Sequence, residues 1–349
     1  MQQHERYMKR CLALAQLGAG SVSPNPMVGA VIVHRQQIIG EGYTSPYGGP
    51  HAEVNAIQSV FKKFGDKASH LLANSTLYVS LEPCAHFGKT PPCVNLIIEN
   101  KIPQVVIACI DPFAKVNGEG INKLTNEGIE VLLGVLDEEA RWVNRRFFTK
   151  LEKSRPYVIL KWAETQDGYF APIDNQQFWI SNRASKQLVH KWRGEEDAIL
   201  VGTNTALIDN PTLTTRFWNG KNPKRILIDK YLDVPESSLI FSDEAETIIF
   251  NEYKSEWTTQ KKWIALENFD LYLPQQILYQ LYLMDVQSLI IEGGAHTLQK
   301  FIDAQLWDEA RVFVSKSSLE KGISAPKLDG ILRESLKISD DSLHVFVSK

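Results

Sequence analysis

The hydrophobic pattern of the first half of the chain alternates between helix and strand. Apolar residues recur mostly every three or four positions over residues 4–17, which is typical of an amphipathic helix. Apolar runs at 28–33 and 38–39 flank a polar stretch and predict a β-hairpin. A Gly-rich loop then leads to a helix that begins at His51 and runs to about Phe64. Strand-like segments at 76–81, 104–110 and 129–135 alternate with helical stretches near 94–99 and 121–126, which predicts an α/β sandwich.

A charged helix from Asp137 to about Lys150 ends this first half, and Pro156 prevents it from continuing. A chain of 349 residues favours two domains. We therefore expect one α/β domain over residues 1–150 and a second over 151–349. The second half should open with a strand at 157–163 and a helix near 182–192, followed by strands at 198–201, 225–228, 247–250 and 288–291.

Composition narrows the class of protein. The chain has 38 Lys and Arg against 41 Asp and Glu, with no run of basic residues, so we expect no nucleic-acid partner. No apolar run approaches the ~18 residues of a membrane-spanning helix. The first ten residues lack the apolar core of a secretory signal, so we expect a cytoplasmic protein without membrane contact. Four cysteines are too few for a disulfide scaffold and suit free, catalytic or metal-bound thiols.

One imidazole and two thiols form the clearest chemical pattern, at His51, Cys84 and Cys93. Such ligands suit tetrahedral zinc and leave its fourth position open to water, which indicates catalysis. Zinc lowers the pKa of water toward ~7. Glu53 would then be the catalytic proton carrier, in the pattern of zinc deaminases. Because residues two apart do not share a helix face, His51 and Glu53 can converge only at the start of a helix.

Other interpretations of these residues stay open. A single His or Cys is more often a buried core residue, and a structural zinc site usually has four protein ligands. His86 is either that fourth ligand or, together with Lys89, part of the pocket lining. Cys11 and Cys109 lie on apolar faces and are expected in the core.

The loop between the two thiols is distinctive, because eight residues separate Cys84 from Cys93 where most zinc deaminases of nucleosides or transfer RNA have two. With the motifs at 24–29 (PNPMVG) and 49–53 (GPHAE), the first half closely resembles the bifunctional deaminase/reductase family of riboflavin biosynthesis. The second half carries landmarks of the family's reductase in the same order, at 161–163, 179–181, 190–193, 209–216 and 292–294. The resemblance implies a cytidine-deaminase-like α/β/α sandwich followed by a dihydrofolate-reductase-like α/β domain.

The resemblance also implies a reaction sequence and its residues. Zinc-dependent deamination of 2,5-diamino-6-(5-phosphoribosylamino)pyrimidin-4-one would be followed by NADPH reduction of the ribosyl group to ribityl, in a homo-oligomer. NADPH would contact Ala163, Trp179, Thr205, Asp209, Gly294, Ala295, His296, Thr297, Leu298, Gln299 and Lys300. The substrate would contact Arg193, Leu213, Arg216 and Glu292, and arginine suits its phosphate. Lys161 and Glu292 are candidates for polar assistance. The chain departs from the family pattern at Phe113, Gln166 and Gln177.

Without the resemblance, the residues of the second half allow other interpretations. Gly293 and Gly294 join a strand to a helix, where glycines serve either phosphate binding or close helix–sheet packing, and the G-x-G-x-x-G fingerprint is missing. Asp209 is alternatively a turn former and each Arg a solvated side chain. Competing functions are a zinc deaminase of another nucleobase or of nucleic acid, and a nucleotide-binding protein without turnover.

Overall fold

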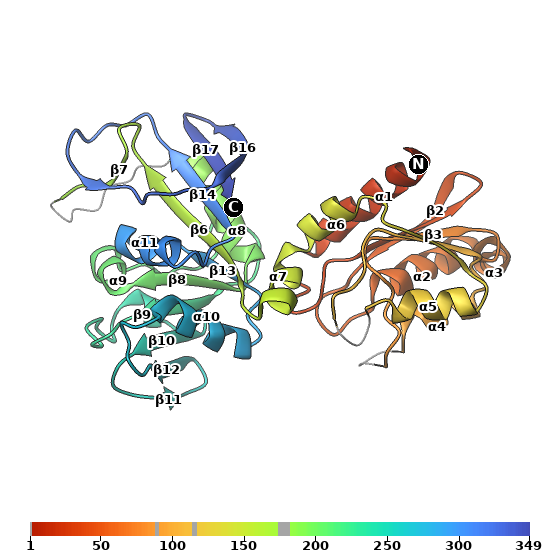
Figure 1. The fold of residues 1–349 in the computed structure, drawn as a ribbon, viewed down its shortest axis with the longest axis horizontal. Helices are drawn as coiled ribbons and strands as arrows, with labels where there is room; N and C mark the ends of the chain where they lie inside the picture. Colours follow the sequence, from red (N-terminus) through yellow and green to blue (C-terminus); the bar gives the residue numbers. More distant parts are fainter. Residues whose placement is uncertain (1, 88–90, 114–116, 174–181) are drawn as a thin grey trace. The chain divides into compact units, whose positions relative to one another are not determined.

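The chain folds into two compact units, Met1–Lys153 and Ser154–Lys349, which we call the amino-terminal and carboxy-terminal units. The computed structural model describes residues 2–87, 91–113, 117–173 and 182–349. Each unit combines one large β-sheet with helices (Figure 1), so the predicted two-domain α/β class is confirmed. Within the described residues no helix is both long and apolar enough to span a membrane.

The amino-terminal unit contains a five-stranded sheet in the order β2-β1-β3-β4-β5. Its strands are β1 (Gly29–His34), β2 (Gln37–Tyr43), β3 (Thr76–Val79), β4 (Gln104–Ile107) and β5 (Glu130–Leu133). β1 pairs antiparallel with β2 and β3, whereas β3, β4 and β5 are parallel. The predicted hairpin is confirmed, and its turn residues Arg35 and Gln36 have φ of 47° and 66°, as the tightest hairpin turns require.

Helices cover both faces of this sheet. They are α1 (Gln2–Ala15), α2 (Ala52–Phe64), α3 (Ala68–Leu72), α4 (Cys93–Glu99), α5 (Glu119–Asn126), α6 (Asp137–Val143) and α7 (Arg145–Lys153), with 3₁₀ turns η1 (Gln16–Gly18) and η2 (Gly65–Lys67). α1 and α2 approach opposite faces: a Cβ on Gly29 would lie 2.0 Å from the Cys11 carbonyl, and one on Gly42 2.4 Å from the Ala56 nitrogen. Both glycines are therefore required by close helix–sheet packing.

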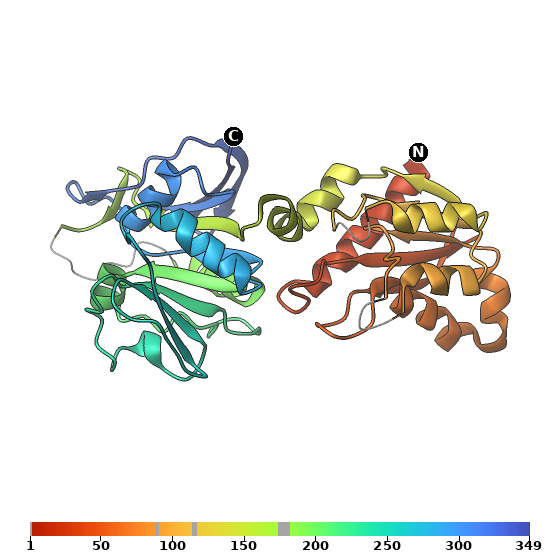
Figure 2. The same ribbon diagram turned by 60° about the horizontal axis from the view of Figure 1, so that its bottom comes forward.

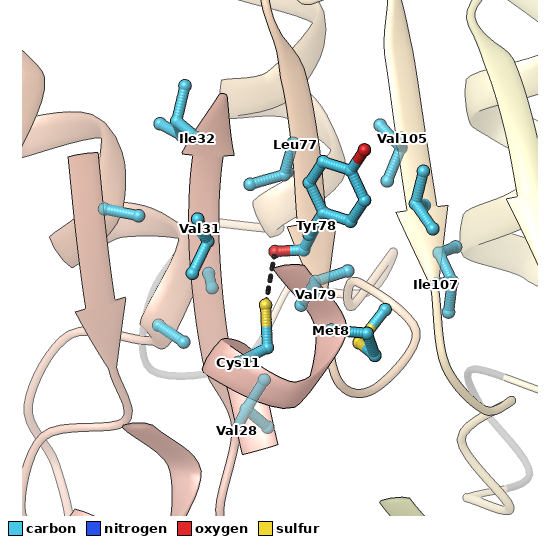
Figure 3. Close-up of a cluster of buried hydrophobic side chains, with 14 of the residues drawn as sticks. Met8, Cys11, Val28, Val31, Ile32, Leu77, Tyr78, Val79, Val105 and Ile107 are labelled. Atoms are coloured by element: carbon cyan, nitrogen blue, oxygen red, sulfur yellow. Dashed lines mark hydrogen bonds between the residues drawn. The ribbon is translucent and has the colours of Figure 1, made fainter. Parts of the chain in front are cut away.

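Figure 3 shows how α1 enters the core. Met8 and Cys11 lie among side chains of β1, β3 and β4, and Cys11 Sγ donates to the Tyr78 carbonyl at 3.4 Å. Cys11 and Cys109 are both fully buried, which confirms their predicted place in the core. Burial raises the pKa of Cys109 to about 12 and that of Cys11 higher still, so both stay protonated.

The prediction of a single charged helix from Asp137 to about Lys150 is wrong. Two helices, α6 and α7, meet at Asn144, and the second continues to Lys153. The Asn144 side chain accepts from the Met27 N–H and donates to the Met27 carbonyl, both at 2.8 Å. Hydrogen bonding of this buried amide to a distant loop competes with a continuous helix, a tertiary effect that periodicity does not reveal.

The carboxy-terminal unit contains a ten-stranded sheet in the order β11-β12-β10-β9-β8-β13-β6-β14-β17-β16. Its parallel strands are β6 (Tyr157–Glu164), β8 (Ala198–Gly202), β9 (Lys224–Ile228), β10 (Thr247–Asn251), β12 (Lys261–Ala265), β13 (Ser288–Ile291) and β14 (Glu309–Val314). The antiparallel ones are β11 (Glu256–Trp257), β16 (Ile331–Ile338) and β17 (Asp341–Val347). β7 (Tyr169–Ala171) pairs separately with β15 (Ile323–Ser324).

Helices cover both faces of the large sheet (Figures 1 and 2). α10 (Leu273–Leu283) and α11 (Ala295–Asp303) pack with one face, whereas α8 (Arg183–Glu195), α9 (Thr203–Asp209) and the turn η3 (Leu239–Phe241) pack with the other. The chain leaves β8 toward β9 and β10, but leaves β13 toward β14 on the opposite side. Strand order therefore reverses between β8 and β13, and in such sheets ligands bind outside the carboxyl ends of the strands at that point.

Candidate active sites

Three separate elements bring the predicted metal ligands together. His51 precedes α2 with an extended backbone (φ −74°, ψ 166°), Cys93 is the first residue of α4, and Cys84 lies in the loop after β3. His51 Nδ1 lies 3.6 Å from Cys84 Sγ and 3.3 Å from Cys93 Sγ, and all three ligand atoms lie within 4.8 Å of one another. One imidazole and two sulfurs at this spacing fit a tetrahedral zinc ion with one open position.

The electrostatics of the two thiols favour a cation between them. The hydrogen bond with Cys93, and then the one with His51, lower the pKa of Cys84 to about 4. The hydrogen bond to Cys84, together with burial, raises the pKa of Cys93 well above its ordinary value. The pair therefore holds one negative charge, and a bound divalent cation would allow both sulfurs to ionise.

Glu53 lies at the start of α2, two residues after His51, and its side chain is buried. Burial raises the pKa of Glu53 to about 7, and the neighbouring Cys84 adds to this rise. A carboxyl group with that pKa exchanges protons readily at neutral pH. His51 and Glu53 therefore converge at the start of a helix, as their spacing in the sequence required.

A cavity of about 360 Å³, which we call the His51 cavity, is lined by His51, Glu53 and Cys84. Its wall includes Phe113, and the ring of His86 lies 5.8 Å from the Phe113 ring. His86 lines the cavity but does not belong to the ligand cluster found among the described residues. Its Nδ1 is buried without a hydrogen-bond partner in the part of the chain that the structure describes. Lys89, the other predicted lining residue, lies outside the described residues.

Two acidic residues of the His51 cavity were missed by sequence reasoning. Glu82 accepts backbone N–H bonds from Asp111, Gly118, Gly120 and Ile121 at 2.9–3.3 Å, and so holds Asp111 and the first turn of α5 near the cavity. Burial raises the pKa of Asp111 to about 6. An acid two residues before a predicted ligand was the only sequence signal for Glu82, and it was insufficient because its partners are distant backbone groups.

A second cavity, of about 250 Å³, lies at the carboxyl ends of β8 and β13, and we call it the Thr297 cavity. A Cβ on Gly202 would lie 2.7 Å from Thr297 Oγ1, and one on Gly293 would lie 2.5 Å from the Val201 Cα atom. Gly294 precedes α11 with φ +47°, a backbone conformation that favours glycine. Gly293 thus serves close packing, whereas Gly294 turns the chain into α11, whose first residues line the cavity at a helix end that suits anions.

The predicted NADPH contacts are only partly brought together. Thr205, Gly294, His296, Thr297 and Lys300 line the Thr297 cavity. Leu298 is instead fully buried in the hydrophobic core, and Gln299 donates to Asp303 and accepts from the Lys327 N–H. The described lining of this cavity does not include Ala163, Asp209 or Ala295. Trp179 and Gln177 lie outside the described residues.

Arg193 and Glu292 form a bidentate ion pair. Arg193 Nη2 lies 2.7 Å from Glu292 Oε2 and its Nε 3.2 Å from Oε1, while Nη1 donates to the Thr214 carbonyl at 3.3 Å. Burial would raise the pKa of Glu292, but Arg193 and Lys161 lower it to about 2. Burial in turn lowers the pKa of Lys161. The Arg193 guanidinium is therefore already bound by a carboxylate, which sequence reasoning did not foresee.

The segment that carries Leu213 and Arg216 is held against α8. The Arg216 N–H donates to His190 Nδ1 at 3.0 Å, and burial lowers the pKa of His190 to about 4, so the ring is a neutral acceptor. Arg216 has an exposed side chain, whereas Leu213 is buried in the core with φ +55°. Arg225, fully buried on β9, donates to the Thr212 carbonyl at 3.5 Å. Sequence reasoning gave no role to His190 or Arg225.

Comparison with known proteins gives a family match for each unit. Residues 1–109 match the model of the cytidine and deoxycytidylate deaminase zinc-binding region, and residues 156–316 match the RibD C-terminal domain. The riboflavin biosynthesis protein RibD of Aquifex aeolicus is 41% identical over 343 residues, which cover 96% of this chain and 93% of that protein. The chain belongs to the RibD family. RibD of Bacillus amyloliquefaciens is 37% identical over 93% of this chain and 87% of its own length.

Solved structures agree over the whole length. A diaminohydroxyphosphoribosylaminopyrimidine deaminase/5-amino-6-(5-phosphoribosylamino)uracil reductase from Thermotoga maritima superposes with a TM-score of 0.90 at 36% identity, covering 100% of this chain and 99% of that one. RibD of Acinetobacter baumannii gives 0.89 at 28% identity, with 100% and 99% coverage. The chain is thus a bifunctional deaminase and reductase of riboflavin biosynthesis that uses zinc and NADPH, as the resemblance predicted. A deaminase of another nucleobase would leave the match of residues 156–316 unexplained.

Proposed function

We propose that the amino-terminal unit deaminates diaminohydroxyphosphoribosylaminopyrimidine and that the carboxy-terminal unit reduces 5-amino-6-(5-phosphoribosylamino)uracil with NADPH. Both reactions are named for the Thermotoga maritima relative. The observation that carries the proposal is the convergence of His51, Cys84 and Cys93 within 4.8 Å, beside a cavity that His51, Cys84 and buried Glu53 line. We assign residues 1–150 to deamination and 151–349 to reduction, close to the division after Lys153.

In the deaminase site, His51, Cys84 and Cys93 would hold zinc. When bound, zinc acts as a Lewis acid and lowers the pKa of water toward ~7. Glu53 accepts the proton that the attacking water loses and delivers a proton to the departing amine, which leaves as ammonia. One carboxyl group can carry both transfers, because burial raises the pKa of Glu53 to about 7 and each proton state is then accessible.

The wall of the His51 cavity would orient the flat heterocycle. Phe113 and His86 offer ring faces, and the carboxyl group of Asp111 offers polar contacts, as does Nδ1 of His86, which has no hydrogen-bond partner among the described residues. A buried polar atom without a protein partner is costly unless a ligand or water pairs with it. We therefore assign His86 to substrate binding rather than to the metal.

In the reductase site, NADPH supplies the hydride, and the protein's residues bind and orient. We assign Gly294, Thr297 and the first N–H groups of α11 to the cofactor phosphates. Ala163, Trp179, Thr205 and Asp209 stay predicted cofactor contacts. Arg216 is the better candidate for the substrate phosphate because Arg193 is bound to Glu292, and the Arg193–Glu292 pair beside Lys161 would face the sugar. Leu213 would contribute through its backbone, since its side chain is in the core.

We also propose a homo-oligomer that forms through β16. This eight-residue strand ends the large sheet, and Ile331, Leu332 and Leu336 on it are 55%, 53% and 41% exposed. A long, exposed edge strand with apolar side chains among its charged ones favours pairing with a second copy, whereas the opposite edge strand, β11, has only two residues. Light scattering should give more than one chain for the natural sequence and a smaller mass for Leu332→Lys. An unchanged oligomer in that variant would contradict this interface.

We propose that the protein works in the cytoplasm, because all four cysteines are free and two of them belong to the metal site. The ligand that we propose is a small molecule rather than a nucleic acid, since the net charge is −3 and the His51 cavity measures about 360 Å³.

Mass spectrometry of the products tests the function. Zinc-loaded protein should convert diaminohydroxyphosphoribosylaminopyrimidine to the aminouracil without NADPH, and to the ribityl product once NADPH is added. Release of ammonia without any reduced product would remove the reductase assignment.

A further inference from the structure

Two lysines, Lys230 and Lys300, line the Thr297 cavity. Lys230 follows β9, and Lys300 lies on α11 one turn beyond His296. Gly294 and Thr297, at the start of α11, line the same cavity. Two lysines and the start of a helix in one cavity suit a ligand that carries anionic groups.

A carboxylate already interacts with both lysines. Asp270, in the loop before α10, places its Oδ2 2.5 Å from Lys230 Nζ, and Lys300 also acts on the Asp270 carboxyl group to lower its pKa. Glu252 is 4.0 Å from Lys230 Nζ but does not line the cavity. The Asp270 side chain is 71% exposed. An exposed ion pair contributes little, so a stronger anion can replace the carboxylate at small cost.

Asp229, the acid that could bind a free ribose hydroxyl, does not line the Thr297 cavity. In nucleotide-binding α/β sheets, a carboxylate at the end of the strand after the phosphate-binding turn accepts a hydrogen bond from the ribose 2′-OH of NAD. Asp229, at the end of β9, is 1% exposed, and its oxygens accept from Asp233 N–H at 3.1 Å, Val234 N–H at 3.0 Å and the Thr203 hydroxyl at 3.3 Å. Asp229 therefore holds its own loop, and the next residue, Lys230, reaches the cavity instead.

We propose that Lys230 and Lys300 bind the 2′-phosphate of NADPH and so select it over NADH, with Asp270 taking the place of that phosphate in the free protein. This inference rests on the proposed reductase function and identifies residues that decide its cofactor. Glu252 stays beside Lys230 at 4.0 Å, but displacement of the exposed Asp270 carboxylate leaves two ammonium groups for the ligand, and these bind a phosphate more strongly than a neutral hydroxyl.

Calorimetry with NADP⁺ and NAD⁺ tests the proposal directly, because the two differ only in the 2′-phosphate. The natural protein should bind NADP⁺ about 100-fold more tightly, and Lys230→Ala and Lys300→Ala should each weaken NADP⁺ about tenfold while changing NAD⁺ less than about twofold. Lys224→Ala is the matched control, since Lys224 lies on β9 but pairs with Glu246 away from the cavity. It should leave both affinities unchanged.

Asp270→Asn separates the two roles of the aspartate. Tighter NADP⁺ with unchanged NAD⁺ supports displacement, whereas weaker NAD⁺ would assign Asp270 to the ribose hydroxyl and overturn the proposal. An unchanged NADP⁺/NAD⁺ ratio in both lysine variants would also overturn it. If those variants still reduce substrate with NADPH as the natural protein does, the reductase function stands and only the assignment of the phosphate site fails. If the natural protein binds neither nucleotide, both the reductase function and the phosphate site are contradicted.

Discussion

The backbone N–H of Cys93 lies 3.3 Å from Sγ of Cys84. Cys93 can make this contact because it is the first residue of α4, where the backbone N–H has no partner within the helix. The second ligand of the metal site therefore stabilises the thiolate of the first.

Glu53→Gln should abolish deamination while zinc stays bound. The amide keeps the size of the side chain but cannot accept and return a proton, so we expect deamination to fall by about 10²-fold or more. Zinc content by atomic absorption and ammonia release measure the two effects. Ammonia release near the natural rate in this variant would refute the role of Glu53.

Cys93→Ala should lose zinc, because only two of the three ligands stay. Cys109→Ala is the matched control: Cys109 is equally buried but lies in the hydrophobic core, away from the ligand cluster. We expect full zinc content in the control and little in Cys93→Ala. Equal zinc in both proteins would place the metal elsewhere.

Glu292→Gln should destabilise the carboxy-terminal unit, because it leaves the Arg193 guanidinium buried without its carboxylate. The two side chains are only 11% and 9% exposed. Removing one partner of a buried ion pair costs roughly 3–5 kcal/mol. Calorimetry should show a lower unfolding temperature, and the surface pair variant Glu152→Gln, whose partner Arg141 is 41% exposed, should show almost none of this shift.

His190 should stay neutral well below neutral pH. Burial lowers its pKa to about 4, and the ring accepts the Arg216 N–H only in the neutral form. The unfolded chain takes up this proton first, near its ordinary value of 6.5, so the contribution of His190 to stability is present above pH 6.5 and declines as pH falls toward 4. Imidazole NMR shifts should show no titration of His190 between pH 7.5 and 5.5. A midpoint near 6.5 would contradict this.

The sequence predicted the elements with strong local signals. The β-hairpin, α2 and the strands of the first sheet followed from periodicity, and the zinc ligands followed from three reactive side chains whose chemistry is rare in that combination. The break at Asn144 could not be predicted, because its cause is a bond to Met27, far away in the sequence. Glu82, His190 and Arg225 were missed for the same reason, since each acts on backbone groups that only the fold brings near.

A coupled assay tests the central claim that one chain carries two consecutive activities at separate sites. Zinc-loaded protein receives diaminohydroxyphosphoribosylaminopyrimidine and NADPH, and ammonia and NADPH absorbance are followed together. We expect ammonia first and NADPH loss after it in the natural protein, and neither in Glu53→Gln until the deaminated aminouracil is added, which should restore NADPH loss alone. Failure of the added aminouracil to consume NADPH in either protein would contradict the account.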